Sequence, residues 1–376
     1  HQAVVPVERG SEGKWSAPPF SGSILNGFVI GRGAIDDKGS LMAILEAVER
    51  LLARGYRPRQ TVYLAFGHDE ERGGAGAGAM AGLLSQRGAD IGLALDEGYA
   101  VLDGVIAGVR PPVAMIGVTE KGYVSVELTA TGAGGHSSMP SADNAAVRIA
   151  RAVGALAENQ MPARIDGPTE AMLDGIAPYA DFPMRAALAN RWLTGALVRR
   201  QFLSSPDTAA AIRTTTAPTI ISAGTKDNVL PQSARAVVNH RILPGDTIES
   251  VIEHDRRAID DSNVQVRALP TRHNPSRPVS IGTPEYRRVA EAIRVSFPEA
   301  AVAPGLVLGA TDGRHYQTVA RGVLRFAPLV MRKDDLARFH GNDERIGIAD
   351  YMRAIDFYER LISESPPPDN SAARPR

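Results

Sequence analysis

The sequence predicts an α/β protein, with a mostly parallel sheet between helices and a second, inserted α+β unit. Strand-like and helix-like segments alternate along the first third of the chain, an order typical of βαβαβ units. Beyond residue 113 the segments become shorter and pair like hairpins, and the final part of the chain returns to the earlier style.

The first unit is predicted from apolar periodicity. Apolar side chains at helical spacing and the stop signal Gly55 predict a helix over residues 36–53. A second helix is expected at residues 78–86. Strands are expected at residues 3–7, 61–66 and 91–95.

The inserted unit is predicted over residues 114–271, between catalytic segments 1–113 and 272–364. Its expected strands are residues 117–131, 220–224, 234–242 and 264–269, and its expected helices are residues 144–158 and 247–259. A last helix is predicted at residues 346–363. The tail, residues 365–376, contains three consecutive prolines and is expected to be disordered.

Composition excludes several classes of protein. The 376 residues carry 42 basic and 42 acidic side chains, so no long-range field favours nucleic acid. Cysteine is absent, which leaves only His, Asp and Glu as metal ligands. No apolar run is long enough to span a bilayer. The chain begins with His1 rather than Met, so we expect the natural start to lie upstream, and the cellular location stays open.

Acidic residues gather where predicted strands end and helices begin. Asp36 and Asp37 open the first helix, residues 69–71 (DEE) follow the second strand, and Asp96 and Glu97 follow the third. The carboxyl ends of parallel strands meet at one crevice, where clustered carboxylates repel one another unless a cation neutralises them. Together with histidines, such carboxylates suit zinc, cobalt or manganese. Each acid taken singly has the alternative of a solvated loop charge.

A dinucleotide-dependent enzyme is a remote alternative. Residues 74–79 (GAGAGA) open a helix, and Asp96 follows about 20 residues later, which loosely matches a dinucleotide-binding fingerprint. However, residues 68–72 (HDEER) separate these glycines from the strand, and their three carboxylates would repel a pyrophosphate.

An ordered set of motifs makes the functional prediction more specific. Residues 1–7 (HQAVVPV), 31–39 (GRGAIDDKG), 69–71 (DEE), 96–98 (DEG), 135–140 (GHSSMP), 239–245 (NHRILPG) and 339–341 (FHG) follow one another along nearly the whole chain. This set resembles the zinc aminoacylase/carboxypeptidase family of metallopeptidases, which includes acetylornithine deacetylase, succinyl-diaminopimelate desuccinylase and carboxypeptidase S. The loop at residues 12–22 and the stretch 161–213 resemble the carboxypeptidase S branch most.

The resemblance implies two Zn²⁺ ions per chain, with Co²⁺ or Mn²⁺ as alternatives. It implies that Asp36 bridges them, that His1 and Asp96 complete one site, and that Glu71 and His340 complete the other. Glu70 would be the general base, which takes a proton from the attacking water and later delivers one to the leaving amine.

The resemblance also implies roles for the inserted unit. The family dimerises through it, and His136 matches the histidine that reaches the partner's crevice to stabilise the oxyanion. Arg241, beside Asn239, matches the arginine that grips the substrate's free carboxylate, and Arg314 is a second candidate contact. The alternatives are a plain turn for His136 and surface positions for Arg241 and Arg314.

One position departs from the family pattern His-x-Asp, because this chain has Ala3 where the family has Asp. That Asp normally orients the metal-binding imidazole, and losing such a partner costs ~10- to 100-fold in affinity or activity. The family also has a helix and strands ahead of His1, so we expect a sheet without them to expose an edge and apolar surface.

Two functions are therefore predicted. The first is a di-zinc hydrolase, a homodimer with no nucleic-acid partner, that cleaves the amide bond of a dipeptide or an N-acyl amino acid with a free carboxylate. The second, favoured by Ala3, is a catalytically impaired homologue that binds such ligands.

Overall fold

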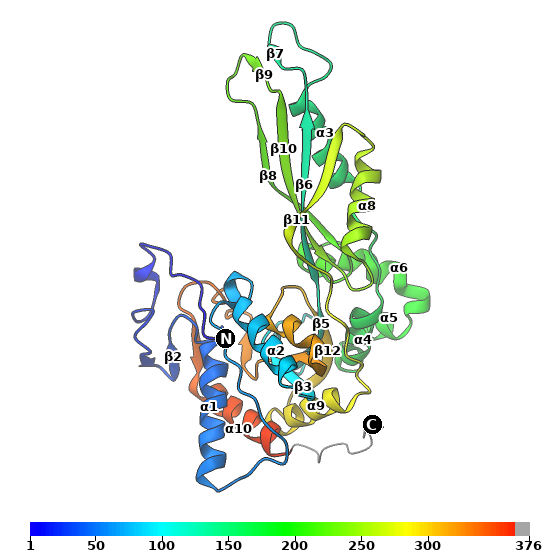
Figure 1. Cartoon of the computed structure of the whole chain (residues 1–376). Helices are drawn as coiled ribbons and strands as arrows, with labels where there is room; N and C mark the ends of the chain where they lie inside the picture. The colour runs from blue at the N-terminus through cyan, green and yellow to red at the C-terminus, as the bar shows by residue number, and fades with distance from the viewer. Residues whose placement is uncertain (365–376) are drawn as a thin grey trace, which may run out of the picture.

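The computed structural model describes residues 1–364 and confirms the α/β class, with helices on both sides of mixed sheets (Figure 1). The tail predicted to be disordered, residues 365–376, lies outside the described residues. Within the described part, no helix is both long and apolar enough to cross a membrane.

The central sheet has six strands and is mostly parallel, with short antiparallel pairings that make it a mixed sheet. Three strand pairs, β12–β5, β13–β3 and β14–β4, are parallel, while β4–β5 and β13–β5 are antiparallel. The strands are β3 (Ile91–Asp96), β4 (Val101–Asp103), β5 (Val113–Glu120), β12 (Ala301–Val307), β13 (Ala320–Arg325) and β14 (Val330–Arg332).

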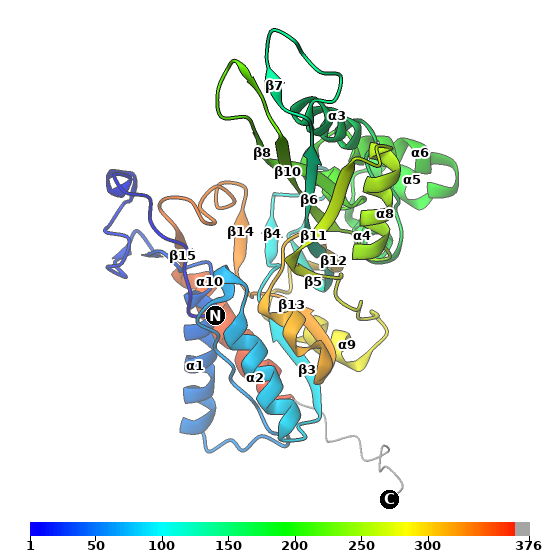
Figure 2. The same cartoon turned by 45° about the horizontal axis from the view of Figure 1, so that its top comes forward.

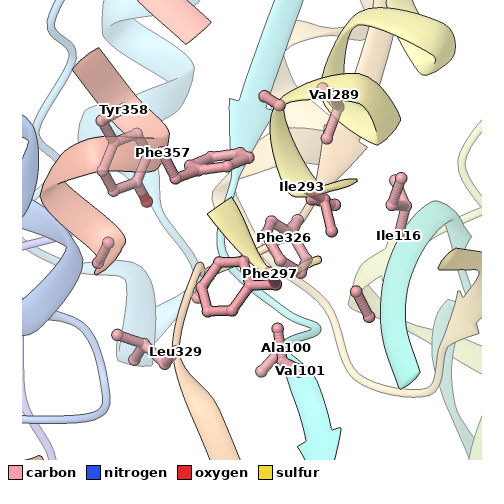
Figure 3. Packing of buried hydrophobic residues seen from close by; sticks show 14 of the residues in the cluster. Ala100, Val101, Ile116, Val289, Ile293, Phe297, Phe326, Leu329, Phe357 and Tyr358 are labelled. Carbon is pink, nitrogen blue, oxygen red and sulfur yellow. The ribbon is translucent and has the colours of Figure 1, made fainter. Parts of the chain in front are cut away.

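The main core lies between this sheet and its helices. Phe326 packs edge-on against Phe357, with ring centroids 5.3 Å apart, and Phe297 and Ile293 fill the neighbouring space (Figure 3). The helices of this part are α1 (Lys38–Ala53), α2 (Ala75–Gln86), α9 (Pro284–Ser296) and α10 (Ile348–Ser363), with 3₁₀ turns η1 (Glu12–Lys14), η2 (Glu70–Arg72) and η4 (Asp312–Thr318). A small antiparallel sheet joins β1 (Ile24–Leu25), β2 (Phe28–Ile30) and β15 (Arg345–Gly347).

Two predicted strands are wrong. Residues 3–7 and 61–66 are extended but form no ladder. Residues 61–66 and β3 both line a cavity of about 560 Å³, and the segment forms no ladder with β3 across it. Val62, Tyr63 and Leu64 of this segment are 38–48% exposed.

The chain leaves the central sheet at Glu120 and enters a four-stranded antiparallel sheet at Gly122. The strand predicted at residues 117–131 therefore belongs to two strands, because the chain passes from one sheet to the other at Lys121. This second sheet has the order β11–β6–β10–β8 and is covered by α3 and α8, which share its core. Its elements are β6 (Gly122–Thr131), α3 (Ala145–Glu158), β8 (Thr215–Ala223), β10 (Ser233–Ile242), α8 (Ile248–Ile259) and β11 (Val264–His273).

Polar caps explain where the helices of this unit begin. The Asn144 side chain accepts hydrogen bonds from two backbone N–H groups of α3, and Thr247 forms a capping box with Ser250 at the start of α8. The assignment of residues 114–271 to a separate inserted domain stays a prediction.

A cluster of short helices packs against β5 and β12 of the central sheet, and α5 and α6 extend outward from there (Figure 1). They are α4 (Gly167–Ile176), α5 (Phe182–Ala189), α6 (Arg191–Phe202) and α7 (Pro206–Ala210), with the 3₁₀ turn η3 (Ala177–Tyr179). At the far end of the sheet, the short strands β7 (Gly135–His136) and β9 (Val229–Leu230) pair with each other.

Candidate metal centre and active site

The carboxylate of Asp36 lies between two imidazoles that are far apart in the sequence. Its Oδ1 is 3.1 Å from Nε2 of His1, and its Oδ2 is 2.6 Å from Nε2 of His340. Asp36 precedes α1, while His340 comes from the loop before β15, so the tertiary fold alone brings them together. One oxygen towards each imidazole is the arrangement that a bridging carboxylate requires.

Two glutamates complete the cluster. Glu71 Oε1 lies 3.4 Å from Nε2 of His340, and Glu70 Oε2 lies 3.8 Å from Nε2 of His1. Two groups have ligand atoms within 4.8 Å of one another: Asp36, Glu71 and His340, and His1, Glu70 and Glu71. The first group contains the side chains that the sequence assigns to one metal site.

Asp96 differs from expectation. It lines the same cavity as His1, but its carboxylate accepts a hydrogen bond from the backbone N–H of Gly313 and lies outside both groups of ligand atoms found among residues 1–364. The reason is local, because Gly313 lies in η4, whose first turn points its N–H at the end of β3.

The cluster carries an excess of negative charge. Burial, reinforced by the charges of Asp312 and Glu71, raises the pKa of Glu70 to about 8. Burial and the neighbouring Asp96 raise the pKa of Glu97 well above its usual range, and the same causes raise that of Asp312 to about 6. Carboxylates this close cannot all ionise without a compensating cation.

The donor set fits a transition-metal ion. Glu71 Oε1 is buried and makes no hydrogen bond within residues 1–364, although it faces the His340 imidazole. Imidazole nitrogens and carboxylate oxygens without thiolates are the ligands found in catalytic zinc sites. An unpartnered carboxylate oxygen among imidazoles is the free ligand that such an ion would take.

The imidazole of His1 has a support that sequence reasoning missed. Its Nδ1 lies 3.0 Å from the backbone carbonyl oxygen of Ala3, which leaves Nε2 facing Asp36. Because a backbone carbonyl can orient a ligand histidine as a carboxylate does, the expectation that Ala3 leaves the ring unanchored is wrong. The backbone nitrogen of His1 also lies 2.9 Å from Oδ2 of the buried Asp37.

Glu344 and Arg32 hold the two ligand loops together. Glu344 accepts hydrogen bonds from the backbone N–H groups of Gly33, Ile35 and Asp36, at 2.7–3.0 Å, and from Arg32 Nη1 at 2.7 Å. Arg32 also donates to the carbonyl oxygens of His340 and Gly341. The pair is buried, so removing one partner costs about 3–5 kcal/mol. A glutamate in a loop carries no sequence signal for such a role.

His136 lies far from this cluster in its own chain. It is exposed on β7, where its Nδ1 is 2.8 Å from Oγ of Ser138. Figures 1 and 2 both place β7 at the tip of the four-stranded sheet, well away from the N-terminus of the chain. Within one chain, the structure does not bring His136 to the other site residues.

The three candidate substrate contacts lie on two different elements, with Arg241 and Asn239 on β10 and Arg314 on η4. Arg241 lies over the ring of Tyr123, 4.9 Å from its centroid, and Asn239 donates to Oγ of Ser125 at 3.1 Å. Arg314 lies in η4, the turn whose Gly313 N–H donates to Asp96, and its guanidinium donates to two backbone carbonyl oxygens. Burial is the main cause that lowers the pKa of His273, and the positive charges of Arg314 and Arg241 lower it further. Both guanidinium groups therefore influence the same imidazole.

The glycine-rich helix start does not resemble a dinucleotide site. Gly74 precedes α2, and the backbone N–H of Gly76 donates to the carboxylate of Asp69 at 3.0 Å. A carboxylate therefore already satisfies the helix start that a pyrophosphate would need.

Comparison with known proteins identifies the family. The sequence matches Peptidase family M20/M25/M40 over residues 1–364. It is 40% identical to an N-fatty-acyl-amino acid synthase/hydrolase PM20D1 of Xenopus tropicalis, covering 98% of this chain and 73% of that protein. It is 39% identical to a probable carboxypeptidase S-like 2 of Dictyostelium discoideum, covering 94% of this chain and 68% of that protein.

A solved structure of the same family has a similar fold. An M20 family metallo-carboxypeptidase of Sulfolobus solfataricus superposes with a TM-score of 0.65 at 21% identity, covering 96% of this chain and 82% of that one. Sequence family, relatives and fold agree with a cluster of imidazoles and carboxylates that suits a metal. The chain belongs to the M20/M25/M40 peptidase family and is a hydrolase of the metallopeptidase and aminoacylase type, acting on C–N bonds.

Proposed function

We propose that this protein is a di-zinc hydrolase that cleaves the amide bond of an N-acyl amino acid or dipeptide with a free carboxylate. The observation that carries the proposal is the Asp36 carboxylate, which offers one oxygen to the side of His1 and the other to the side of His340. The names of the PM20D1 and carboxypeptidase S-like relatives support this substrate class.

The chain would hold the ions through Asp36, Glu71 and His340 on one side, and through Asp36, His1 and Asp96 on the other. When bound, the ions would supply Lewis acidity to the scissile carbonyl and to the attacking water. Glu70 would take the proton of that water and pass it to the leaving amine nitrogen. Burial and the neighbouring carboxylates raise its pKa to about 8, and the positive charge of the bound ions would lower it towards the neutral range that proton transfer requires.

Arg241 and Arg314 would bind the free carboxylate of the substrate, with Asn239 beside them. Their positive charges converge near His273, and a guanidinium can donate two parallel hydrogen bonds to a carboxylate. This contact would orient the amide relative to Glu70.

His136 would act on the crevice of a partner subunit in a homodimer. Its exposed position at the tip of the four-stranded sheet supports this proposal, and so does the outer strand of that sheet. In β8, Ile220 and Ile221 are 48% and 61% exposed on an edge that no other described strand covers. An exposed apolar edge strand is a surface that favours pairing with another chain.

The test combines metal content with substrate discrimination. Zinc-replete protein is expected to hold close to two metal ions per chain by elemental analysis, and to hydrolyse N-acyl amino acids. The same compounds with an amidated carboxyl group should react far more slowly, because the arginines then lose their charged partner. His340→Ala should lower the bound zinc. Absence of bound metal would contradict the di-zinc centre, and tight binding without turnover would favour the catalytically impaired homologue.

A substitution at Ala3 tests how much zinc affinity and activity are lost through the departure from the His-x-Asp motif. Ala3→Asp is expected to raise zinc affinity and kcat/KM by less than about tenfold, below the usual range for restoring such a partner, because the backbone already holds Nδ1 of His1. Zinc competition with a chelator and steady-state kinetics measure both quantities. The control is Gln2→Asp, which adds the same charge at the exposed neighbouring position. A gain near 100-fold would show that the Ala3 carbonyl supports the ring poorly.

A further inference from the structure

The outer face of α6 carries apolar side chains that do not pack into the hydrophobic core. Trp192, Leu193 and Leu197 are 85%, 70% and 62% exposed; Leu193 and Leu197, four residues apart, share one side of the helix, and Trp192 lies at the margin of that side. The inner side is already occupied, since Val198 is buried and Phe202 packs against the same cluster. Figures 1 and 2 both show α5 and α6 at the outer edge of the molecule, where a flat surface could reach them.

Positive charges without partners accompany this apolar stripe. Arg185 on α5 and Arg199 and Arg200 at the end of α6 are exposed and form no ion pair within residues 1–364. Most acids on these short helices are already engaged, because Glu170 and Asp174 bind Arg191, and Asp181 binds Arg110, whereas the exposed Asp207 on α7 forms no ion pair within residues 1–364. The surface therefore presents aromatic and aliphatic side chains together with three uncompensated guanidinium groups.

We propose that α5 and α6 dock this protein onto an anionic phospholipid surface. Trp192, Leu193 and Leu197 enter the boundary between headgroups and acyl chains, and the three arginines bind the phosphate and carboxylate groups of the lipids. Helices with this combination of Trp, Leu and Arg lie in the plane of the interface. Each arginine close to an anionic bilayer strengthens binding about fivefold.

A second copy of the chain fits this face less well. A two-fold dimer would place the same patch on both sides of the interface, so Arg185, Arg199 and Arg200 would meet their own copies. Like charges in such an interface oppose association, whereas an anionic bilayer neutralises all three.

The experiment uses the zinc-loaded protein and vesicles of phosphatidylcholine, with or without phosphatidylserine. Sedimentation with vesicles should show binding to the serine-containing vesicles that weakens as salt is raised. Trp192 emission should shift to the blue, while buried Trp15 contributes an unchanged signal. Replacing the three arginines with Gln should weaken binding about 100-fold, and replacing Trp192, Leu193 and Leu197 with Ser should weaken it at least tenfold.

Phe20→Ser is the matched control, because Phe20 is equally exposed, at 72%, but lies elsewhere on the molecule. It should leave vesicle binding unchanged. Hydrolysis of soluble substrate should be unchanged in both triple variants, which separates this proposal from the catalytic one. Failure to bind serine-containing vesicles would overturn the proposal. So would self-association of the parent protein that the Ser variant abolishes, because the face would then be an interface between copies.

Discussion

Glu70→Gln is expected to lower kcat by about 10²- to 10⁴-fold while zinc content and KM stay nearly unchanged. The amide keeps the shape of the side chain, so the loops around Asp36 and His340 need not move. It cannot accept and return a proton at the pH of the reaction, so both the attack of water and the departure of the amine lose their proton carrier. Steady-state kinetics and elemental analysis on one preparation measure the two effects.

Glu71→Gln is the matched control, because it makes the same change at the adjacent residue. Glu71 belongs to both groups of ligand atoms, and its buried Oε1 lies 3.4 Å from Nε2 of His340 without forming a hydrogen bond. Its loss should therefore reduce zinc content first, and added zinc should restore part of the activity. A Glu70→Gln enzyme as active as the parent would remove Glu70 from the role of base.

His136→Ala should reduce kcat by about 100- to 1,000-fold without loss of zinc, the usual effect of removing an oxyanion donor. The location of His136 at the tip of the four-stranded sheet makes the test specific. Chains carrying His136→Ala, mixed with chains carrying Glu70→Gln, should recover activity through mixed dimers. Each mixed dimer contains one crevice with an intact Glu70 and an intact His136 from the partner subunit.

The size of the recovery follows from the symmetry of the dimer. With free exchange of subunits, half of the dimers are mixed and one of their two sites is intact, so about a quarter of the parent activity should return. A mixture of His136→Ala with the double variant His136→Ala/Glu70→Gln should recover none. Absence of recovery under conditions of proven subunit exchange would show that His136 does not act across an interface.

Local sequence patterns predicted five of the ten α-helices of residues 1–364, and they missed α9 and the short helices α4 to α7. The helix expected at residues 36–53 is α1, Lys38–Ala53, and the helix expected at residues 247–259 is α8, which begins at its Thr247 cap. Such predictions succeed because apolar spacing and capping act within a few residues of one another. The segment 61–66 failed for the complementary reason, since its composition suits a strand but a ladder needs a partner from elsewhere in the chain.

The order of motifs along the chain by itself determined the family, the α/β class and the set of candidate metal ligands, because these depend on residue identity and spacing. Only the tertiary structure decided how Asp36 meets both His1 and His340, since loops more than 300 residues apart converge there. It also revealed the backbone carbonyl that supports His1, and Glu344, which ties the two loops together. Every residue has a backbone carbonyl, so the sequence does not show which of them will accept a hydrogen bond. The sequence also does not distinguish a glutamate that becomes buried from one that stays in solvent. The roles of this carbonyl and of Glu344 come from desolvation and long-range proximity, which exist only once the chain has folded.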